Sequence, residues 1–126
     1  MKLKIKYSKG ELTAPELSRI RTALSRDLPI WAEGVEIGLK EVEDDIETYP
    51  TSIYICGGAS ALPEMKLALQ EHPWLQVLPF ARFPKVEYLY PKLLAEIEDN
   101  TKSINDPSDI TPLALARMYL ETKDKL

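Results

Sequence analysis

The sequence is poor in the residues that build disulfides, catalytic clusters and membrane spans. Its 126 residues include one cysteine, Cys56, and one histidine, His72, so an internal disulfide is excluded and a reducing compartment is indicated. A catalytic triad or a metal site around His72 would need partners at definable spacings, and none is visible in the sequence. No stretch approaches the roughly 20 apolar residues of a bilayer span, and residues 1–7 alternate lysine with apolar residues instead of forming a signal peptide. We therefore expect a cytoplasmic protein without direct membrane insertion.

Positive charge is also scarce. The chain carries 16 lysine and arginine residues against 20 aspartate and glutamate residues, a formal net charge of -4. Because no face is dense in Lys or Arg, binding to a phosphate backbone has no electrostatic basis, and nucleic acid is not an expected partner. What the chain does have is a hydrophobic content of 44%, spread over nearly its whole length, which predicts an ordered globular domain.

The first part of the chain predicts helices after a short opening element. The stretch "KLKIKY" alternates lysine with apolar residues, and this period of two predicts a half-buried strand, with the end of a helix as the alternative. Thr13 and Pro15 predict a helix start, and Pro29 predicts an interruption. Gly34 and Gly38 lie close to the apolar face of a second helix and predict close packing of another backbone. That face consists of Trp31, Val35, Leu39, Val42 and Ile46.

The second part alternates predicted strands and helices. "SIYIC" predicts a strand covered on both faces, and the helix that follows the glycines has Ser60 as its cap and ends near His72. "WLQVLPF" predicts another short strand, whereas "ARFPKVEYL" is ambiguous. Pro91 opens a further predicted helix, and a polar loop leads to a closing helix that starts at Thr111-Pro112.

This order of elements predicts an α/β fold in which a short parallel sheet is flanked by helices. Residues 1–126 are predicted to form a single domain. A hinge near Glu47–Pro50 would separate a leading helical subdomain, residues 1–47, from an α/β part, residues 48–126.

Gly57 and Gly58 lie where the predicted strand meets the predicted helix. A helix start exposes N–H groups and a positive dipole end, and glycine lets a flat or anionic ligand approach the main chain. Ligands of α/β sheets also tend to bind at the carboxyl ends of strands. The alternative interpretation is a turn without a ligand, because Gly-Gly alone lacks the spacing of a dinucleotide fingerprint or a P-loop.

The stretch "IYICGGASALPEMKLAL" resembles the adenosine-binding segment of the actin-like ATPase superfamily. The resemblance is strongest to the bacterial branch that contains the cell-division protein FtsA and the pilus-assembly protein PilM. "LKIKYSKGEL", "WAEGVEIGLKE" and "DPSDITPLALARMYL" resemble other segments of the family, and Glu64 stands where the family often has glycine. The distinctive match consists of Gly57, Gly58, Ala59, Ser60, Leu62 and Pro63.

The resemblance implies a partial actin-like lobe of the ribonuclease H-like class that belongs to a longer protein, with a helix at Leu3–Tyr7. In the family the glycines contact adenosine through the main chain, the serine caps the helix or reaches the sugar, and a Glu–Lys pair approaches the ribose or adenine. Met1 stands in place of that glutamate. Carried over to this chain, the cofactor-binding residues are Gly57, Gly58, Ala59, Ser60 and Lys4.

The resemblance also bears on activity. The two Asp-x-Gly loops that hold phosphates and magnesium in the family are absent from this sequence. We therefore expect a lobe that binds ATP or ADP, with Mg held by another part of the protein, and that does not hydrolyse ATP alone. The implied role is filament or scaffold assembly in cell division or pilus assembly, peripheral to the inner membrane, through self-association or other proteins of these systems. The alternatives are a protein-interaction module that binds no nucleotide and a small α/β enzyme that uses Cys56.

Other residues have structural interpretations beside functional ones. Trp31 and Trp74 are predicted to be core or interface anchors, and Cys56 a small core filler or a reactive thiol. His72 is predicted at a helix end, where the dipole favours imidazolium. "EVEDD" predicts a solvated helix end, with a cation site as the alternative, and "FARFPKVEYLYP" predicts either a partner surface or a packed edge.

Overall fold

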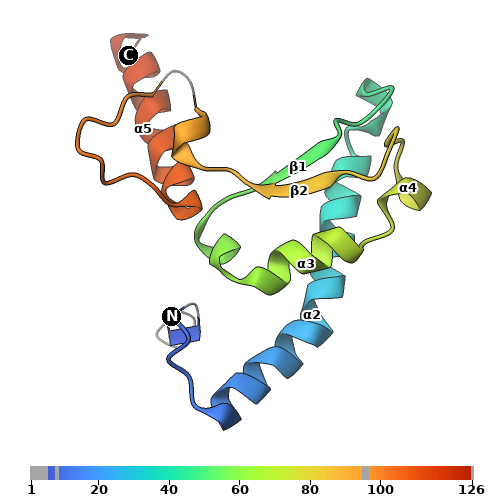
Figure 1. Cartoon of the computed structure of the whole chain (residues 1–126). Helices are drawn as coiled ribbons and strands as arrows, with labels where there is room; N and C mark the ends of the chain where they lie inside the picture. Colours follow the sequence, from blue (N-terminus) through green and yellow to red (C-terminus); the bar gives the residue numbers. More distant parts are fainter. Residues whose placement is uncertain (1–5, 8, 95–96, 126) are drawn as a thin grey trace.

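The computed structural model describes residues 6–7, 9–94 and 97–125 (Figure 1). It is a mixed α/β fold, mostly helical, with a two-stranded parallel sheet between helices. Most of "KLKIKY", including Lys4, lies outside the described residues. Lys6 and Tyr7 are helical, so the predicted strand is wrong for the part of that stretch which the structure describes.

Helix α2 spans Ala14–Lys40 and is a single helix. The Glu16 carboxylate accepts hydrogen bonds from the N–H and the hydroxyl of Thr13, at 3.0 and 2.9 Å, which confirms the predicted start. The predicted interruption at Pro29 is wrong, since this residue lies inside the helix. A proline there costs about 3 kcal/mol, and the burial of Leu28 and Ala32 on either side of it offsets this cost.

The second half of α2 ends earlier than predicted, and its two glycines have open space beside them. The helix ends at Lys40, before the acidic 3-10 turn η1, Glu43–Asp45, because acidic side chains oppose the negative end of the helix dipole. A Cβ at Gly34 or Gly38 would meet nothing within 4 Å, so the predicted close approach of another backbone is wrong. Four residues of the predicted face do pack against the core: Trp31, Val35 and Leu39 in the helix, and Ile46 after it.

The sheet pairs β1, Ser52–Ile55, with β2, Lys85–Tyr88, in parallel. Ser52 lies opposite Lys85, and Ile55 lies opposite Tyr88. The strand at β1 and the parallel sheet confirm the prediction, but the expected cover on both faces is wrong because Tyr54 is 51% exposed. The partner strand lies in the ambiguous stretch "ARFPKVEYL".

The stretch predicted as the second strand is helical. After α3, Pro63–Glu71, a short helix α4 spans Trp74–Val77. The Trp74 indole N–H donates to the Leu69 carbonyl at 2.7 Å, which anchors the chain as it turns back after α3. Apolar runs of this length fit a buried helix as well as a strand.

The core lies where α2, α3, α4 and the two strands meet. Trp74 is completely buried there, and its ring centroid lies 5.9 Å from that of Phe80, which in turn lies 5.0 Å from Tyr49. Trp31 is partly buried against this cluster, so both tryptophans are core residues, as predicted. The buried members of the cluster are Ala32, Tyr49, Leu69, Trp74, Leu78, Phe80 and Val86.

The carboxyl-terminal part stands apart from this core. The helix predicted from Pro91 is a 3-10 turn, η3, Pro91–Leu93, and the polar loop leads to η4, Pro107–Asp109, and α5, Ile110–Thr122. Figure 1 shows α5 at the opposite end of the sheet from α2 and α4. The closing helix is confirmed, but most of its apolar side chains are exposed, with Leu115, Met118, Tyr119 and Leu120 at 57, 57, 64 and 57%.

The total accessible surface is large for the mass. A folded monomer of 14.3 kDa is expected to expose about 6,800 Å², and this chain exposes 9307 Å². Exposed large hydrophobic residues lie on α2, α3, α4 and α5. Within the described residues, none of the helices combines the length and the apolar character that a bilayer span requires.

Candidate functional site

The glycine corner, Gly57–Leu62, joins β1 to α3. Gly57 has φ +90° and ψ 172°, a conformation that is essentially restricted to glycine. Its N–H donates to the Pro107 carbonyl at 2.9 Å, so the corner is tied to the segment that precedes α5. The chain then makes a 3-10 turn, η2, Gly58–Ala61, before α3 begins.

Ser60 shapes this corner without capping α3. Its hydroxyl donates to the Gly57 carbonyl at 2.6 Å, and its N–H donates to the same oxygen at 3.0 Å. The N-cap position of α3 belongs to Leu62, so the predicted helix-capping role of Ser60 is wrong. Pro63 at the first helical position leaves one fewer N–H to satisfy, which explains why a polar cap is not needed.

A hollow of about 180 Å³ opens beside the corner. The rings of Tyr88 and Tyr90 meet there edge to face, with centroids 6.2 Å apart. The Lys66 ammonium lies 5.0 Å from the Tyr88 ring and the Lys92 ammonium 5.5 Å from the Tyr90 ring. The hollow is lined by Ser60, Ala61, Tyr88, Tyr90, Asp106 and Pro107.

Asp106 closes one side of this hollow. Its carboxylate accepts the N–H of Ser108 at 2.9 Å, and this bond followed by one from the Ser108 hydroxyl lowers the pKa of Asp106. The side chain therefore carries a negative charge whose main partner is the main chain of η4. An aromatic floor, ammonium groups and one fixed carboxylate form a site suited to a planar polar ring.

The predicted site residues are only partly brought together. Ser60 lines the hollow, whereas Gly57, Gly58 and Ala59 lie next to it in the chain without lining it. The N–H groups of Gly58 and Ala59 make no hydrogen bond to another main-chain group among the described residues. Lys4 lies outside the described part of the chain, so its predicted contact stays a prediction.

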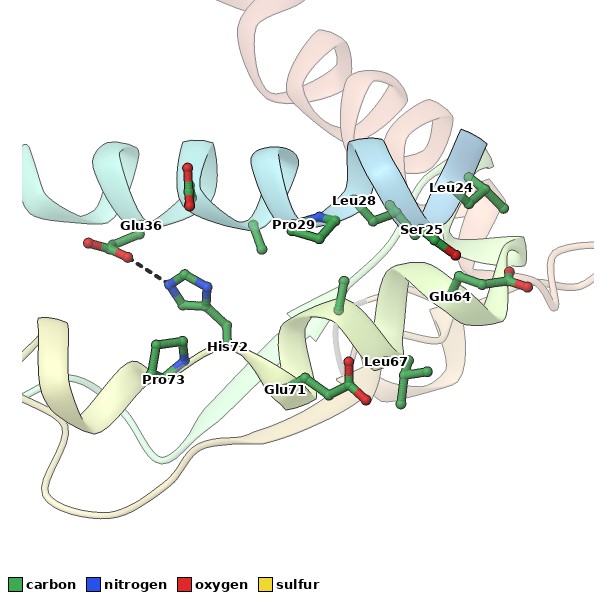
Figure 2. A pocket seen from close by; sticks show the side chains of 13 residues that line it. Leu24, Ser25, Leu28, Pro29, Glu36, Glu64, Leu67, Glu71, His72 and Pro73 are labelled. Carbon is green, nitrogen blue, oxygen red and sulfur yellow. Dashed lines mark hydrogen bonds and ion pairs between the residues drawn. The ribbon is translucent and has the colours of Figure 1, made fainter. Parts of the chain in front are cut away.

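A second and larger cavity lies between α2 and α3. It has a volume of about 540 Å³ and is closed at one end by His72, whose Nε2 lies 2.7 Å from a carboxylate oxygen of Glu36 (Figure 2). The Lys40 ammonium first and His72 second hold the pKa of Glu36 below its ordinary value. His72 does end α3, as predicted, and its ring is hydrogen-bonded to Glu36 of α2.

Cys56 and the acidic run are both exposed, and a reactive thiol at Cys56 stays a prediction. Cys56 is exposed after the end of β1, so its predicted role as a core filler is wrong. Among the residues that the structure describes, no three His, Cys, Asp or Glu side chains are grouped so that they could hold a metal ion. The acidic run Glu43–Asp45 is exposed, in agreement with a solvated helix end.

Sequence reasoning missed Tyr88 and Tyr90 as neighbours of the glycine corner. Their stretch "FARFPKVEYLYP" was predicted as a partner surface or a packed edge; Val86 is buried, as in a packed edge, and Phe83 is 45% exposed, so the partner surface stays a prediction. Two tyrosines separated by one residue were the available signal. It became informative only once β2 was placed beside β1. Comparison with known proteins gives no match for this chain among family models, curated proteins or solved structures.

Proposed function

We propose that this chain is the adenine-nucleotide-binding lobe of a bacterial actin-like protein of cell division or pilus assembly, and that it is not catalytic alone. One observation carries the proposal: a glycine corner in a glycine-only conformation lies directly beside a small hollow with two tyrosine rings. Such a corner lets a ligand approach main-chain N–H groups, and the rings offer faces on which a purine can stack.

In this proposal the base enters the hollow between Ser60 and the tyrosines. The N–H groups of Gly58 and Ala59 are available to the sugar, since they have no main-chain acceptor among the described residues. The ammonium groups of Lys66 and Lys92 lie beside the rings and favour a ligand that carries phosphates. Lys4 is proposed to approach the ribose, as the family resemblance implies.

In this proposal the hollow beside the glycine corner forms only half of a nucleotide site. A volume of about 180 Å³ is below the roughly 300 Å³ at which small-molecule sites begin, so the phosphates extend beyond it. A second lobe of a longer protein would cover them and hold Mg with its phosphate loops. Bound nucleotide would then bridge the two lobes and favour a closed arrangement that is competent for assembly.

A thermal-shift titration with ATP, ADP and GTP tests this function. A ligand at 100 times its dissociation constant raises the free energy of unfolding by about 2.7 kcal/mol. We expect a shift with ATP and ADP that Gly58→Asp abolishes, because its carboxylate repels phosphate and its bulk fills the approach. Gly34→Asp makes the same change on an exposed face of α2 and should leave the shift intact. The absence of a shift in the longer protein, or equal shifts in both variants, would rule out the corner as the site.

The second candidate is a protein-interaction module that binds no nucleotide, and the exposed apolar side chains of α5 favour it. Sedimentation velocity of the wild type and of a Leu115→Gln, Tyr119→Gln variant separates the two candidates. If the chain self-associates through α5 and no nucleotide shifts its melting temperature, the interaction module is correct. A nucleotide shift that persists in this variant supports the first proposal.

A further inference from the structure

We infer that the groove between α2 and α3 binds a basic amphipathic helix of a partner protein. The groove and the glycine corner have no lining residue in common, so this inference does not rest on nucleotide binding. The cavity volume of about 540 Å³ lies within the roughly 300 to 1,000 Å³ of typical ligand sites. Figure 2 shows the side chains of Leu24 and Leu28 on one wall and that of Leu67 on the other.

The floor of the groove is apolar. Leu28 and Ala32 are buried, whereas Leu67 is 50% exposed at the rim. An apolar strip between two helices fits the face of a third helix, which would place residues at i, i+3, i+4 and i+7 along it. The shape of the groove therefore indicates that the ligand is a helix, but it does not indicate the charge of that helix.

The rim of the groove is acidic, and this sets the charge of the partner. Its ionisable lining residues are one histidine and four glutamates, with no lysine or arginine among them. Glu36 is paired with Lys40 and His72, but Glu33 and Glu71 have no ion-pair partner within the described part of the chain. Basic side chains on both sides of an apolar helix face would pair with these carboxylates. An anionic membrane surface is repelled by them.

Two hydrogen-bond acceptors among the residues that line the groove also favour a basic partner. One carboxylate oxygen of Glu64 accepts the Tyr7 hydroxyl, while the other is buried and has no hydrogen-bond partner among the described residues. Pro29 has no N–H, so the main-chain carbonyl of Ser25 lacks its normal helical donor, and both residues line the groove. Ser25 is exposed, so a basic side chain of a ligand can supply the donor that Pro29 lacks, and the unpartnered Glu64 oxygen favours positive charge nearby.

Fluorescence anisotropy with two labelled peptides tests the inference. The probe is the synthetic peptide Ac-KLLKKLLKKLLK-amide, and its counterpart replaces every lysine with glutamate. We expect saturable binding of the basic peptide in the micromolar range, weakened by added salt, and no binding of the acidic one. No saturable binding of the basic peptide, or equal binding of both, overturns the inference.

Matched variants place the binding in the groove. The double variant Glu33→Gln, Glu71→Gln should weaken binding by about three- to tenfold, and the control Glu87→Gln, Glu98→Gln, which removes the same charge elsewhere on exposed residues, should not. Leu67→Gln should weaken it further, and Leu75→Gln, at a site of similar exposure on α4, should leave it unchanged. Equal effects of a variant and its control would overturn the inference. Self-association that Leu67→Gln abolishes would also overturn it, because a second copy of the chain would then fill the groove.

Discussion

His72 at the end of α3 and Glu36 in α2 are hydrogen-bonded to each other, with the imidazole Nε2 2.7 Å from a carboxylate oxygen. Both side chains are largely buried, at 8 and 13% exposed, and the other carboxylate oxygen accepts the Lys40 ammonium at 2.6 Å. The His72 ring also packs on Trp74, with centroids 4.4 Å apart. The pair therefore joins the two helices at the border between the apolar core and the groove.

This pair makes stability depend on pH. The pKa of Glu36 in the folded protein lies below its ordinary value of 4.5, chiefly through Lys40 and then through His72. A group with a lowered folded pKa contributes stability that is present above its unfolded pKa and is lost as the pH falls through the folded pKa. We expect the urea midpoint to fall as the pH drops through 4.5 and on through the lower folded pKa, and Glu36→Gln to reduce this dependence. Glu41→Gln, on an exposed neighbour, is the control, and equal pH profiles for both variants would contradict the prediction.

The core depends on one aromatic side chain. Trp74 is completely buried and its indole N–H is bonded to Leu69, so Trp74→Ala should lower the free energy of unfolding by about 3–5 kcal/mol. Leu75→Ala, at the adjacent and half-exposed position, should change it by less than about 0.5 kcal/mol. Urea denaturation followed by circular dichroism measures both values. A small loss for Trp74→Ala would show that the core is not organised around this residue.

Two glycines should respond to alanine with opposite signs. Gly57 has φ +90°, a conformation that costs other residues about 1–3 kcal/mol, so Gly57→Ala should destabilise the protein by that amount. Gly34 lies in the middle of α2 with open space around it, so Gly34→Ala should stabilise it by about 0.5–1 kcal/mol. Differential scanning calorimetry compares the two variants with the wild type. The same sign for both would refute this interpretation of their backbone conformations.

Replacement of the proline inside α2 should stabilise the protein against unfolding. Pro29→Ala restores the N–H that bonds the Ser25 carbonyl, and the exposed side chain of Pro29 contributes little packing. We expect the free energy of unfolding to rise by about 1–3 kcal/mol. Chemical denaturation gives the change, with Pro15→Ala in the first turn, where proline is tolerated, as the control. A loss of stability in Pro29→Ala would mean that the ring itself supports the groove.

Local patterns predicted the elements whose signals are complete within a few residues. The start of α2 at Thr13, the strand β1 and the end of α3 at His72 all follow from capping, β-branched or helix-ending residues that act on their neighbours. The single helix through Pro29 was not predictable in this way. Ala32 is buried in the core together with Leu69 of α3, a distant segment, and such tertiary packing overrides a local preference.

The candidate site was likewise predictable only where its signal lies within a few neighbouring residues. The sequence located the corner at Gly57 because a strand, two glycines and a helix occur in order. It could not place Tyr88 and Tyr90 there, since their position depends on the parallel register in which Ile55 lies opposite Tyr88. The groove likewise depends on how α2 and α3 pack, which no spacing within either helix encodes.

The two strands of the sheet differ in how well their outer edges are protected. Each is paired on one side only in the described part of the chain, which leaves main-chain groups open to another polypeptide. Lys85 and Glu87 put charges on β2, whereas β1, Ser52–Ile55, has none and exposes Tyr54. Of these two edges, β1 is therefore the one expected to pair with another copy at high protein concentration, and Tyr54→Lys should weaken that pairing.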